Sequence, residues 1–228
     1  MNKKLSIIIP VYNEAATVGS VLERVDAALV LGLRKEIIVV DDGSVDGTDK
    51  ILEENKEKFN FIYEKHPKNM GKGAAFRTGL ELATGDFIIV QDADLEYNPN
   101  NFQDLLNALE EGVAAVYGSR NINPKRRGYA HFVWGVKFLT GVINLLFGSK
   151  LTDSYTCYKL FRASLFNSIA LESHGFEIEA EITAKILKKG LVIKEVPIEY
   201  FPRKFSQGKK IRFRDGLIGL WTIFKYRV

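Results

Sequence analysis

The segment Leu5-Ser-Ile-Ile-Ile-Pro-Val-Tyr-Asn-Glu14 decides the fold class, because a run of mostly apolar residues gives way at once to proline and polar residues. Such a run predicts a buried strand that ends in a loop. Similar runs recur at Glu36 to Val40, Asn60 to Tyr63, Phe87 to Val90 and Val113 to Tyr117. Apolar residues at helical spacing lie between them, as in Val18, Leu22, Val25, Leu29 and Phe102, Leu105, Leu106, Leu109. This alternation predicts a Rossmann-like α/β fold, with a mostly parallel sheet and helices on both faces.

The composition is that of one ordered chain of enzyme size. Its 228 residues are 46% hydrophobic and 26% charged, as in ordinary globular domains. The single cysteine, Cys157, cannot form an internal disulfide, and the N-terminal residues lead into the first strand without the apolar stretch of a signal peptide. We therefore expect a cytoplasmic protein.

The net charge of +4 is concentrated at the C-terminus. Residues Arg203 to Val228 contain eight Lys or Arg and one Asp, so the preceding residues carry a net charge of −3. A basic segment of this kind suits the phosphates of a substrate, a lipid headgroup layer or nucleic acid. Acidic clusters at the strand ends would repel a polyanion, so we expect no nucleic-acid partner.

Polar clusters follow four of the predicted strands, at the edge where parallel sheets bind ligands. They span Pro10 to Glu14, Asp41 to Ser44, Asp92 to Asp94 and Gly118 to Arg120. In Asp92-Ala-Asp94-Leu-Glu96, acids at alternate positions follow a buried strand. Clustered carboxylates repel unless a cation compensates them, and Mg²⁺ or Mn²⁺ accepts carboxylate, phosphate and water oxygens. The run predicts a metal with a nucleotide diphosphate; the alternative is that the acids cap the next helix or face solvent.

The loop Asn69-Met-Gly-Lys-Gly73 is predicted to open a helix and leaves two interpretations. Its glycines suit either the close approach of an anionic ligand or a plain tight turn. Its spacing fits neither the Walker arrangement nor the dinucleotide fingerprint.

Two segments in the second half have wide apolar faces, and each follows a basic cluster. They are Ala130 to Phe147, after Lys125 to Arg127, and Gly216 to Val228, after Lys209 to Arg214. This pattern predicts helices at a membrane surface, whereas the alternative is core helices packed on the sheet or on each other. The first helix also carries a polar stripe of Lys137, Thr140, Gly141 and Asn144. Between the two segments we expect a helix over Ile178 to Lys188 and a strand over Val192 to Tyr200.

Motifs in a fixed order resemble the family-2 glycosyltransferases with the GT-A fold. They are Ile7 to Glu14, Val39 to Ser44, Asn69 to Gly73, Asp92 to Asp94, Gly118 to Arg120 and Glu195 to Pro197. Within that family the chain is most similar to the dolichol-phosphate mannose synthase, or polyprenyl-phosphate sugar transferase, branch. The resemblance implies a GT-A catalytic domain over residues 1–210 and a basic amphipathic helix over 211–228 at a membrane interface.

The resemblance also implies roles for individual residues. The nucleotide would be held by Pro10, Tyr12, Glu14, Asp42, Asp92 and Ala93; Mg²⁺ or Mn²⁺ by Asp94 and Glu96; and phosphate groups by Arg120, Arg203 and Lys209. The branch often has Gln at the position of Glu96. Lys210 is an alternative to Lys209, because the segment departs from the common Arg…Gly-x-Ser-Lys pattern. Arg203 and Lys209 lie outside the apolar-periodic segments, so we expect exposed side chains with little effect on stability.

The implied reaction moves a hexose from a nucleotide-diphosphate sugar, of the GDP-mannose or UDP-glucose type, to a polyprenyl or dolichyl phosphate with inversion, at the cytoplasmic face of a membrane. A phosphate acceptor is already ionised, whereas a hydroxyl acceptor such as a glycan would need a base. Glu179 and Glu181 are the candidate bases, and each could instead belong to a solvated helix face. A non-catalytic membrane-surface protein is a further alternative, which leaves the acids at the strand ends unexplained.

Overall fold

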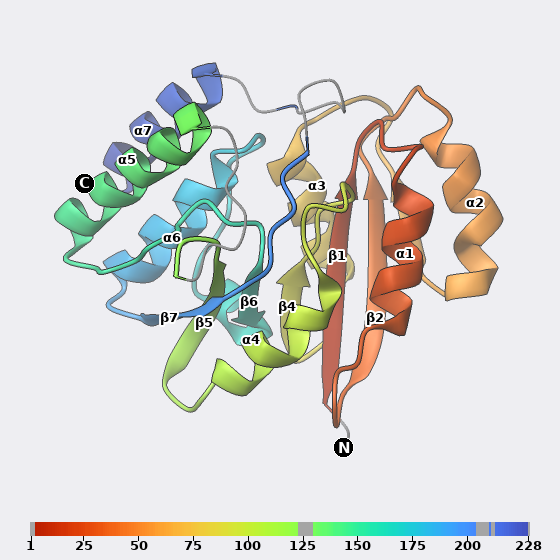
Figure 1. Ribbon diagram of the computed structural model, residues 1–228, viewed down its shortest axis with the longest axis horizontal. Helices are drawn as coiled ribbons and strands as arrows, with labels where there is room; N and C mark the ends of the chain where they lie inside the picture. The colour runs from red at the N-terminus through yellow and green to blue at the C-terminus, as the bar shows by residue number, and fades with distance from the viewer. Residues whose placement is uncertain (1–2, 123–129, 204–209, 211–212, 228) are drawn as a thin grey trace.

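The computed structural model describes residues 3–122, 130–203, 210 and 213–227, and a seven-stranded sheet forms its centre (Figure 1). The strand order is β3-β2-β1-β4-β6-β5-β7. The strands are β1 (Lys4–Val11), β2 (Arg34–Asp41), β3 (Ile62–Lys65), β4 (Phe87–Val90), β5 (Val113–Ser119), β6 (Lys159–Arg162) and β7 (Val192–Pro197). In the described sheet, β6 runs antiparallel to β4 and β5, and the other pairs are parallel. The predicted mostly parallel sheet is confirmed; β6 was not predicted, and β7 ends at Pro197 rather than Tyr200.

Helices lie in the connections between the strands, and the last helix follows β7. They are α1 (Val18–Ala27), α2 (Thr48–Phe59), α3 (Lys72–Leu82), α4 (Phe102–Ala108), α5 (Ala130–Phe147), α6 (Ile178–Lys188) and α7 (Phe213–Arg227), with short 3-10 helices at Pro99–Asn101 and Ala163–Asn167. In Figure 1, α1 lies in front of the sheet and α3 behind it. The main core lies around β1, where Ile7, Ile8 and Ile9 are fully buried. Because β2 and β4 flank β1 on opposite sides, the ligand crevice expected of such a sheet lies at the carboxyl end of β1.

A smaller core lies among α5, α6 and α7. Its buried members are Leu139, Ile143, Leu151, Ala180 and Ile223. Figure 1 shows α5 and α7 side by side, at the end of the molecule away from α2. Large apolar side chains on these two helices are nevertheless exposed, namely Trp134, Phe138, Leu145, Phe213, Leu217, Trp221 and Phe224. The alternative of packed core helices therefore holds in part, since each helix has a packed face and an exposed apolar face, and the membrane-surface location stays a prediction.

A helix can cross a membrane only if it is long and apolar enough to span the bilayer. Among the residues that the structure describes, no helix combines the length and the apolar character needed to span a bilayer. The basic cluster Lys125 to Arg127 lies outside the described residues, as do Lys209, Ile211 and Arg212 of the second cluster.

Candidate active site at the carboxyl edge of the sheet

The acidic run after β4 lies at the carboxyl edge of the sheet. The hydroxyl of Thr17, just before α1, donates to the carbonyl oxygen of Ala93 at 2.7 Å, which ties the run to the loop after β1. The side chains of Asp94 and Glu96 are 12% and 7% exposed. Asn98, beyond the run, accepts the hydrogen bond that caps the following 3-10 helix. The alternative of capping or solvent-facing acids is therefore wrong.

Asp92 belongs to a series of alternating charges. Its Oδ1 lies 2.8 Å from Nζ of Lys72, the first residue of α3. The same ammonium group lies 3.1 Å from Oε1 of Glu179, whose other oxygen contacts Nζ of Lys159. Lys159 is a residue of β6 and is buried. Each buried charge has an opposite charge beside it, which offsets the cost of removing it from water.

Asp94 shares Arg203 with Glu14. Nη2 of Arg203 lies 3.1 Å from Oδ2 of Asp94, and Nη1 lies 3.0 Å from Oε1 of Glu14. Nζ of Lys210 lies 2.6 Å from the same Glu14 oxygen. The side chain of Arg203 is only 13% exposed, so the expectation of an exposed Arg203 is wrong. Lys209 lies outside the described residues.

The two aspartates of the run differ in pKa because their neighbours differ. Burial, followed by the charges of Asp92 and Glu96, raises the pKa of Asp94 to about 7, although Arg203 opposes the rise. Burial acts in the same direction on Asp92, but the charge and hydrogen bond of Lys72, together with Cys157 and Arg203, outweigh it, so the pKa of Asp92 is lowered. Asp94 is therefore the less compensated carboxylate, and added positive charge would stabilise it most.

The oxygens at Asp94 fit a hard divalent cation. Mg²⁺ is usually bound by one or two carboxylates, with substrate phosphates and water completing its coordination. Within the described residues, no group of three His, Cys, Asp or Glu side chains could hold a metal ion. A cation at Asp94 would complete its coordination with oxygens of phosphate or water. This donor set agrees with the predicted pairing of metal and nucleotide.

Glu96 makes contacts of a different kind from Asp94. Its Oε2 accepts a hydrogen bond from the hydroxyl of Tyr200 at 2.8 Å, and its Oε1 accepts one from the amide of Arg203 at 2.8 Å. Glu96 thus anchors the segment that brings Arg203 to Asp94. Its role as a metal ligand stays a prediction.

The residues predicted to bind the nucleotide follow, or end, three neighbouring strands. They are Pro10, Tyr12 and Glu14 at β1, Asp42 at β2, and Asp92 and Ala93 at β4. Asp42 accepts hydrogen bonds from the amides of Met70 and Gly71 at 2.8 and 2.7 Å, and Nδ1 of His66 lies 2.7 Å from it. The observed contacts of Asp42 hold the glycine-bearing loop, and its contact with a base or ribose stays a prediction.

The glycines of that loop are explained by protein packing. A Cβ on Gly71 would lie 2.4 Å from the carbonyl oxygen of His174, and one on Gly73 would lie 2.5 Å from that of Ser173. Both positions therefore exclude any larger residue. The loop contributes Lys72 to the site through its side chain, because α3 begins at this residue.

Both candidate bases are buried and engaged by lysines. Glu181 is fully buried and contacts Nζ of Lys185 at 2.5 Å, and Glu179 lies between Lys72 and Lys159. The alternative of a solvated helix face is therefore wrong for both. Burial opposes ionisation of Glu181, but hydrogen bonds from Lys185 and from the loop before α6 lower its pKa. A carboxylate held in this way is a weak proton acceptor.

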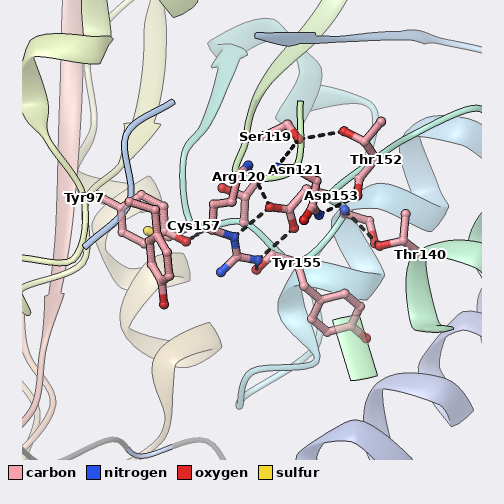
Figure 2. Close-up of polar contacts among 12 residues, drawn as sticks. Tyr97, Ser119, Arg120, Asn121, Thr140, Thr152, Asp153, Tyr155 and Cys157 are labelled. Carbon is pink, nitrogen blue, oxygen red and sulfur yellow. Dashed lines mark hydrogen bonds and ion pairs between the residues drawn. The ribbon is translucent and has the colours of Figure 1, made fainter. Parts of the chain in front are cut away.

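Arg120 follows β5 and forms a two-pronged ion pair with Asp153 (Figure 2). Nε lies 2.7 Å from Oδ2 of Asp153, and Nη2 lies 2.8 Å from Oδ1. The guanidinium also stacks on Tyr200, with 5.1 Å between Cζ and the ring centre. Burial would lower the pKa of Arg120, but the charge and hydrogen bonds of Asp153, together with the nearby Tyr97 and Tyr200, outweigh burial and raise the pKa. The site therefore keeps Arg120 charged.

Comparison with known proteins identifies the family and the fold. The family model described as "Glycosyl transferase family 2" matches residues 6–170. The chain belongs to glycosyl transferase family 2. The family-2 chain is 31% identical to a dolichol-phosphate mannosyltransferase of Pyrococcus furiosus, over 98% of this chain and 61% of that protein. It is 29% identical to an undecaprenyl-phosphate 4-deoxy-4-formamido-L-arabinose transferase of Klebsiella pneumoniae, over 91% of this chain and 62% of that protein.

The family-2 chain thus spans about three fifths of the length of these curated relatives. Its fold also matches the crystal structure of glucosyl-3-phosphoglycerate synthase from Mycobacterium tuberculosis in complex with Mn²⁺, uridine diphosphate and glucosyl-3-phosphoglycerate. The TM-score is 0.75 at 20% identity, with 98% of this chain and 80% of the other covered. The resemblance inferred from the ordered motifs and the GT-A fold are both confirmed.

Three charged residues of the site were not predicted for the family-2 chain. Lys72 stands between two glycines at the start of a helix, Lys159 stands in an otherwise apolar stretch, and Asp153 stands in a polar stretch before β6. A lone charge in an apolar strand is a local sign of a buried ion pair. The partners of these residues are distant in sequence, so local patterns do not identify them.

The raised pKa of Asp94 predicts how stability depends on pH. In the presence of EDTA, Asp94→Asn should increase the free energy of unfolding at pH 8 by roughly 1–4 kcal/mol and change it little at pH 4. The carboxyl group of Asp94 has a pKa of about 7 in the folded chain, against about 3.9 in the unfolded chain. Between these two pH values the unfolded chain gives up the proton more readily, so the ionised group destabilises the folded state as pH rises. Urea unfolding at both pH values measures the difference. Asp104→Asn, at an exposed position on α4, is the control, and an Asp94→Asn effect that did not depend on pH would contradict the raised pKa.

Proposed function

We propose that this chain transfers a hexose from a nucleotide-diphosphate sugar to a polyprenyl or dolichyl phosphate, with inversion at the anomeric carbon. One observation carries the proposal: the poorly compensated carboxylate of Asp94 lies at the ligand-binding edge of a family-2 chain. Mg²⁺ or Mn²⁺ held by Asp94 and Glu96 would supply Lewis-acid stabilisation of the departing diphosphate. The Mn²⁺ and uridine diphosphate in the matched mycobacterial structure support this assignment.

The remaining donor contacts come from loops around the same edge. In this proposal Pro10, Tyr12, Glu14, Asp42, Asp92 and Ala93 hold the nucleotide. Arg203 bridges Asp94 and Glu14, so a diphosphate beside Asp94 would lie within reach of its guanidinium. Its positive charge would stabilise the negative charge that develops on the leaving group. We propose the same function for Lys209 and keep Lys210, which contacts Glu14, as its alternative.

The acceptor is proposed to be a phosphate because the candidate bases for a hydroxyl are already paired with cations. Glu179 and Glu181 are held by lysines, and Asp153 is paired with Arg120. A phosphate oxygen is already ionised near neutral pH and can attack without a base. The names of the Pyrococcus and Klebsiella relatives, which contain dolichol phosphate and undecaprenyl phosphate, support a lipid phosphate. A glycan hydroxyl is the alternative acceptor.

The exposed apolar face of α5 and α7 supports a membrane-surface location. Trp134, Phe138 and Trp221 are 72%, 62% and 69% exposed. Aromatic side chains on neighbouring amphipathic helices, near basic residues, suit insertion at the headgroup boundary. We propose that the helix within residues 211–228 lies in this interface, together with α5, at the cytoplasmic face of the membrane.

Donor turnover should depend on a divalent cation through Asp94. With GDP-mannose or UDP-glucose, Mn²⁺ and geranylgeranyl phosphate, we expect transfer to the phosphate and none to geranylgeraniol. EDTA and Asp94→Asn should each lower kcat by about 100-fold or more, because removing stabilisation of developing charge typically costs 10²–10³ in rate. Mass spectrometry of the lipid products measures transfer. Undiminished transfer in EDTA and in Asp94→Asn would disprove the metal assignment, whereas equal transfer to the alcohol would disprove the phosphate acceptor.

Membrane binding should depend on the exposed aromatic residues. In sedimentation with vesicles that contain anionic lipid, the double variant Trp221→Ala, Phe224→Ala should bind more weakly than the wild type, and wild-type binding should fall as salt rises. The matched control is Leu29→Ala, Leu31→Ala, because both leucines are 72% exposed but lie next to α1. Wild-type protein that stays in the supernatant at low salt would contradict the membrane-surface location.

A further inference from the structure

The loop between α5 and β6 contacts Arg120 through Asp153, which is fully buried (Figure 2). Its carboxylate accepts three hydrogen bonds from Arg120: from the backbone amide at 3.1 Å, from Nε at 2.7 Å and from Nη2 at 2.8 Å. Nη2 also donates to the carbonyl oxygen of Tyr155 at 3.1 Å. Within the described residues, Nη1 is the guanidinium nitrogen that has no acceptor. In Figure 2 it points away from Asp153.

Asp153 is itself held from two sides. Glu195 in β7 accepts hydrogen bonds from the amides of Thr152 and Asp153, at 2.8 and 2.9 Å, and from the hydroxyl of Thr152 at 3.0 Å. On the other side, the hydroxyl of Thr140 on α5 lies 2.9 Å from that of Ser154 and accepts a hydrogen bond from the Ser154 amide at 3.2 Å. The polar stripe of α5 and the Glu195 motif thus share one structural task, which is to fix this loop.

These contacts remove the rotational freedom that an exposed arginine would have. An arginine that binds phosphate from solvent loses side-chain entropy on binding, whereas one already fixed by its partners does not. The pair of Arg120 and Asp153 has no net charge, so its attraction for an anion depends on direction. The fixed guanidinium offers a phosphate oxygen donors in one orientation.

We propose that Asp153 is a positioning residue for glycosyl transfer, which orients Arg120 so that Nη1 donates to a phosphate oxygen of the acceptor. The proposal rests on the proposed function, since that function provides Arg120 with a phosphate. Asp153 acts through Arg120 and does not touch the substrate. The hydrogen bonds to the Asp153 carboxylate come from Arg120, so removal of its charge should weaken use of the acceptor and spare use of the donor.

The test compares Asp153→Asn, Arg120→Met and the double variant, with geranylgeranyl phosphate as acceptor and GDP-mannose or UDP-glucose as donor. We expect kcat/KM for the acceptor to fall about 10- to 100-fold in Asp153→Asn, the range for loss of one charge-assisted hydrogen bond, with the donor KM almost unchanged. The double variant should be no worse than Arg120→Met, because residues that act as a unit are not additive.

Glu36→Gln is the control for stability. Glu36 is 12% exposed and pairs with Lys4 at 2.6 Å, near the amino ends of β1 and β2. This variant should lower the melting temperature without changing the acceptor kinetics. If Asp153→Asn does not fold, Glu195→Gln can replace it, because Glu195 holds the same loop. This variant should lower kcat/KM for the acceptor by a smaller factor and leave the donor KM almost unchanged.

The possible failures can be told apart. The positioning role would be refuted if Arg120→Met lost activity clearly while Asp153→Asn kept wild-type acceptor kinetics. If Glu195→Gln replaces Asp153→Asn, the same result in that variant would refute it. Either result would leave the proposed function intact. Wild-type kinetics in Arg120→Met would refute the phosphate role of Arg120 itself. Additive losses, or equal losses for donor and acceptor, would show that Asp153 only supports the structure.

Discussion

The compensation of buried carboxylates at the carboxyl edge of the sheet is the constraint on which the rest of the structure depends. An ionised group in a protein interior is costly unless an opposite charge lies beside it. Here the compensating cations come from the start of α3, from the segment after β7 and from the end of β5. The pairs are Asp92 with Lys72, Glu14 with Arg203, and Asp153 with Arg120. Distant parts of the chain are thereby fixed around one edge, and Asp94 is left with an excess of negative charge.

Much of this edge could be predicted from the sequence because its signals are local. A buried parallel strand is an apolar run that ends in polar residues, so the ends of β1, β2 and β4 could be placed without a structure. The spacing of Asp92, Asp94 and Glu96 already indicated a cation, since such acids repel one another. The order of the motifs then supplied the family, which the match over residues 6–170 confirms.

The rest of the site depends on contacts between residues that are far apart in the sequence, and local sequence patterns do not predict such contacts. Arg203 looked like an exposed residue of a basic segment, but its side chain is only 13% exposed and pairs with Glu14, 189 positions away. Strand β6 is short and antiparallel, and its buried Lys159 interrupts the apolar run that would have revealed it. The observed partners of Glu96 are the hydroxyl of Tyr200 and the amide of Arg203, which lie 104 and 107 positions away. The exposed faces of α5 and α7 depend on how the two helices pack together.

We propose that the poorly compensated carboxylate of Asp94 binds a divalent cation, which in turn binds the donor diphosphate. Anomalous diffraction from crystals soaked with Mn²⁺ and GDP or UDP tests it most directly. We expect a manganese peak at about 2.0–2.3 Å from a carboxylate oxygen of Asp94, with diphosphate oxygens completing the coordination of the ion. A bound nucleotide with the manganese peak away from Asp94 would contradict it.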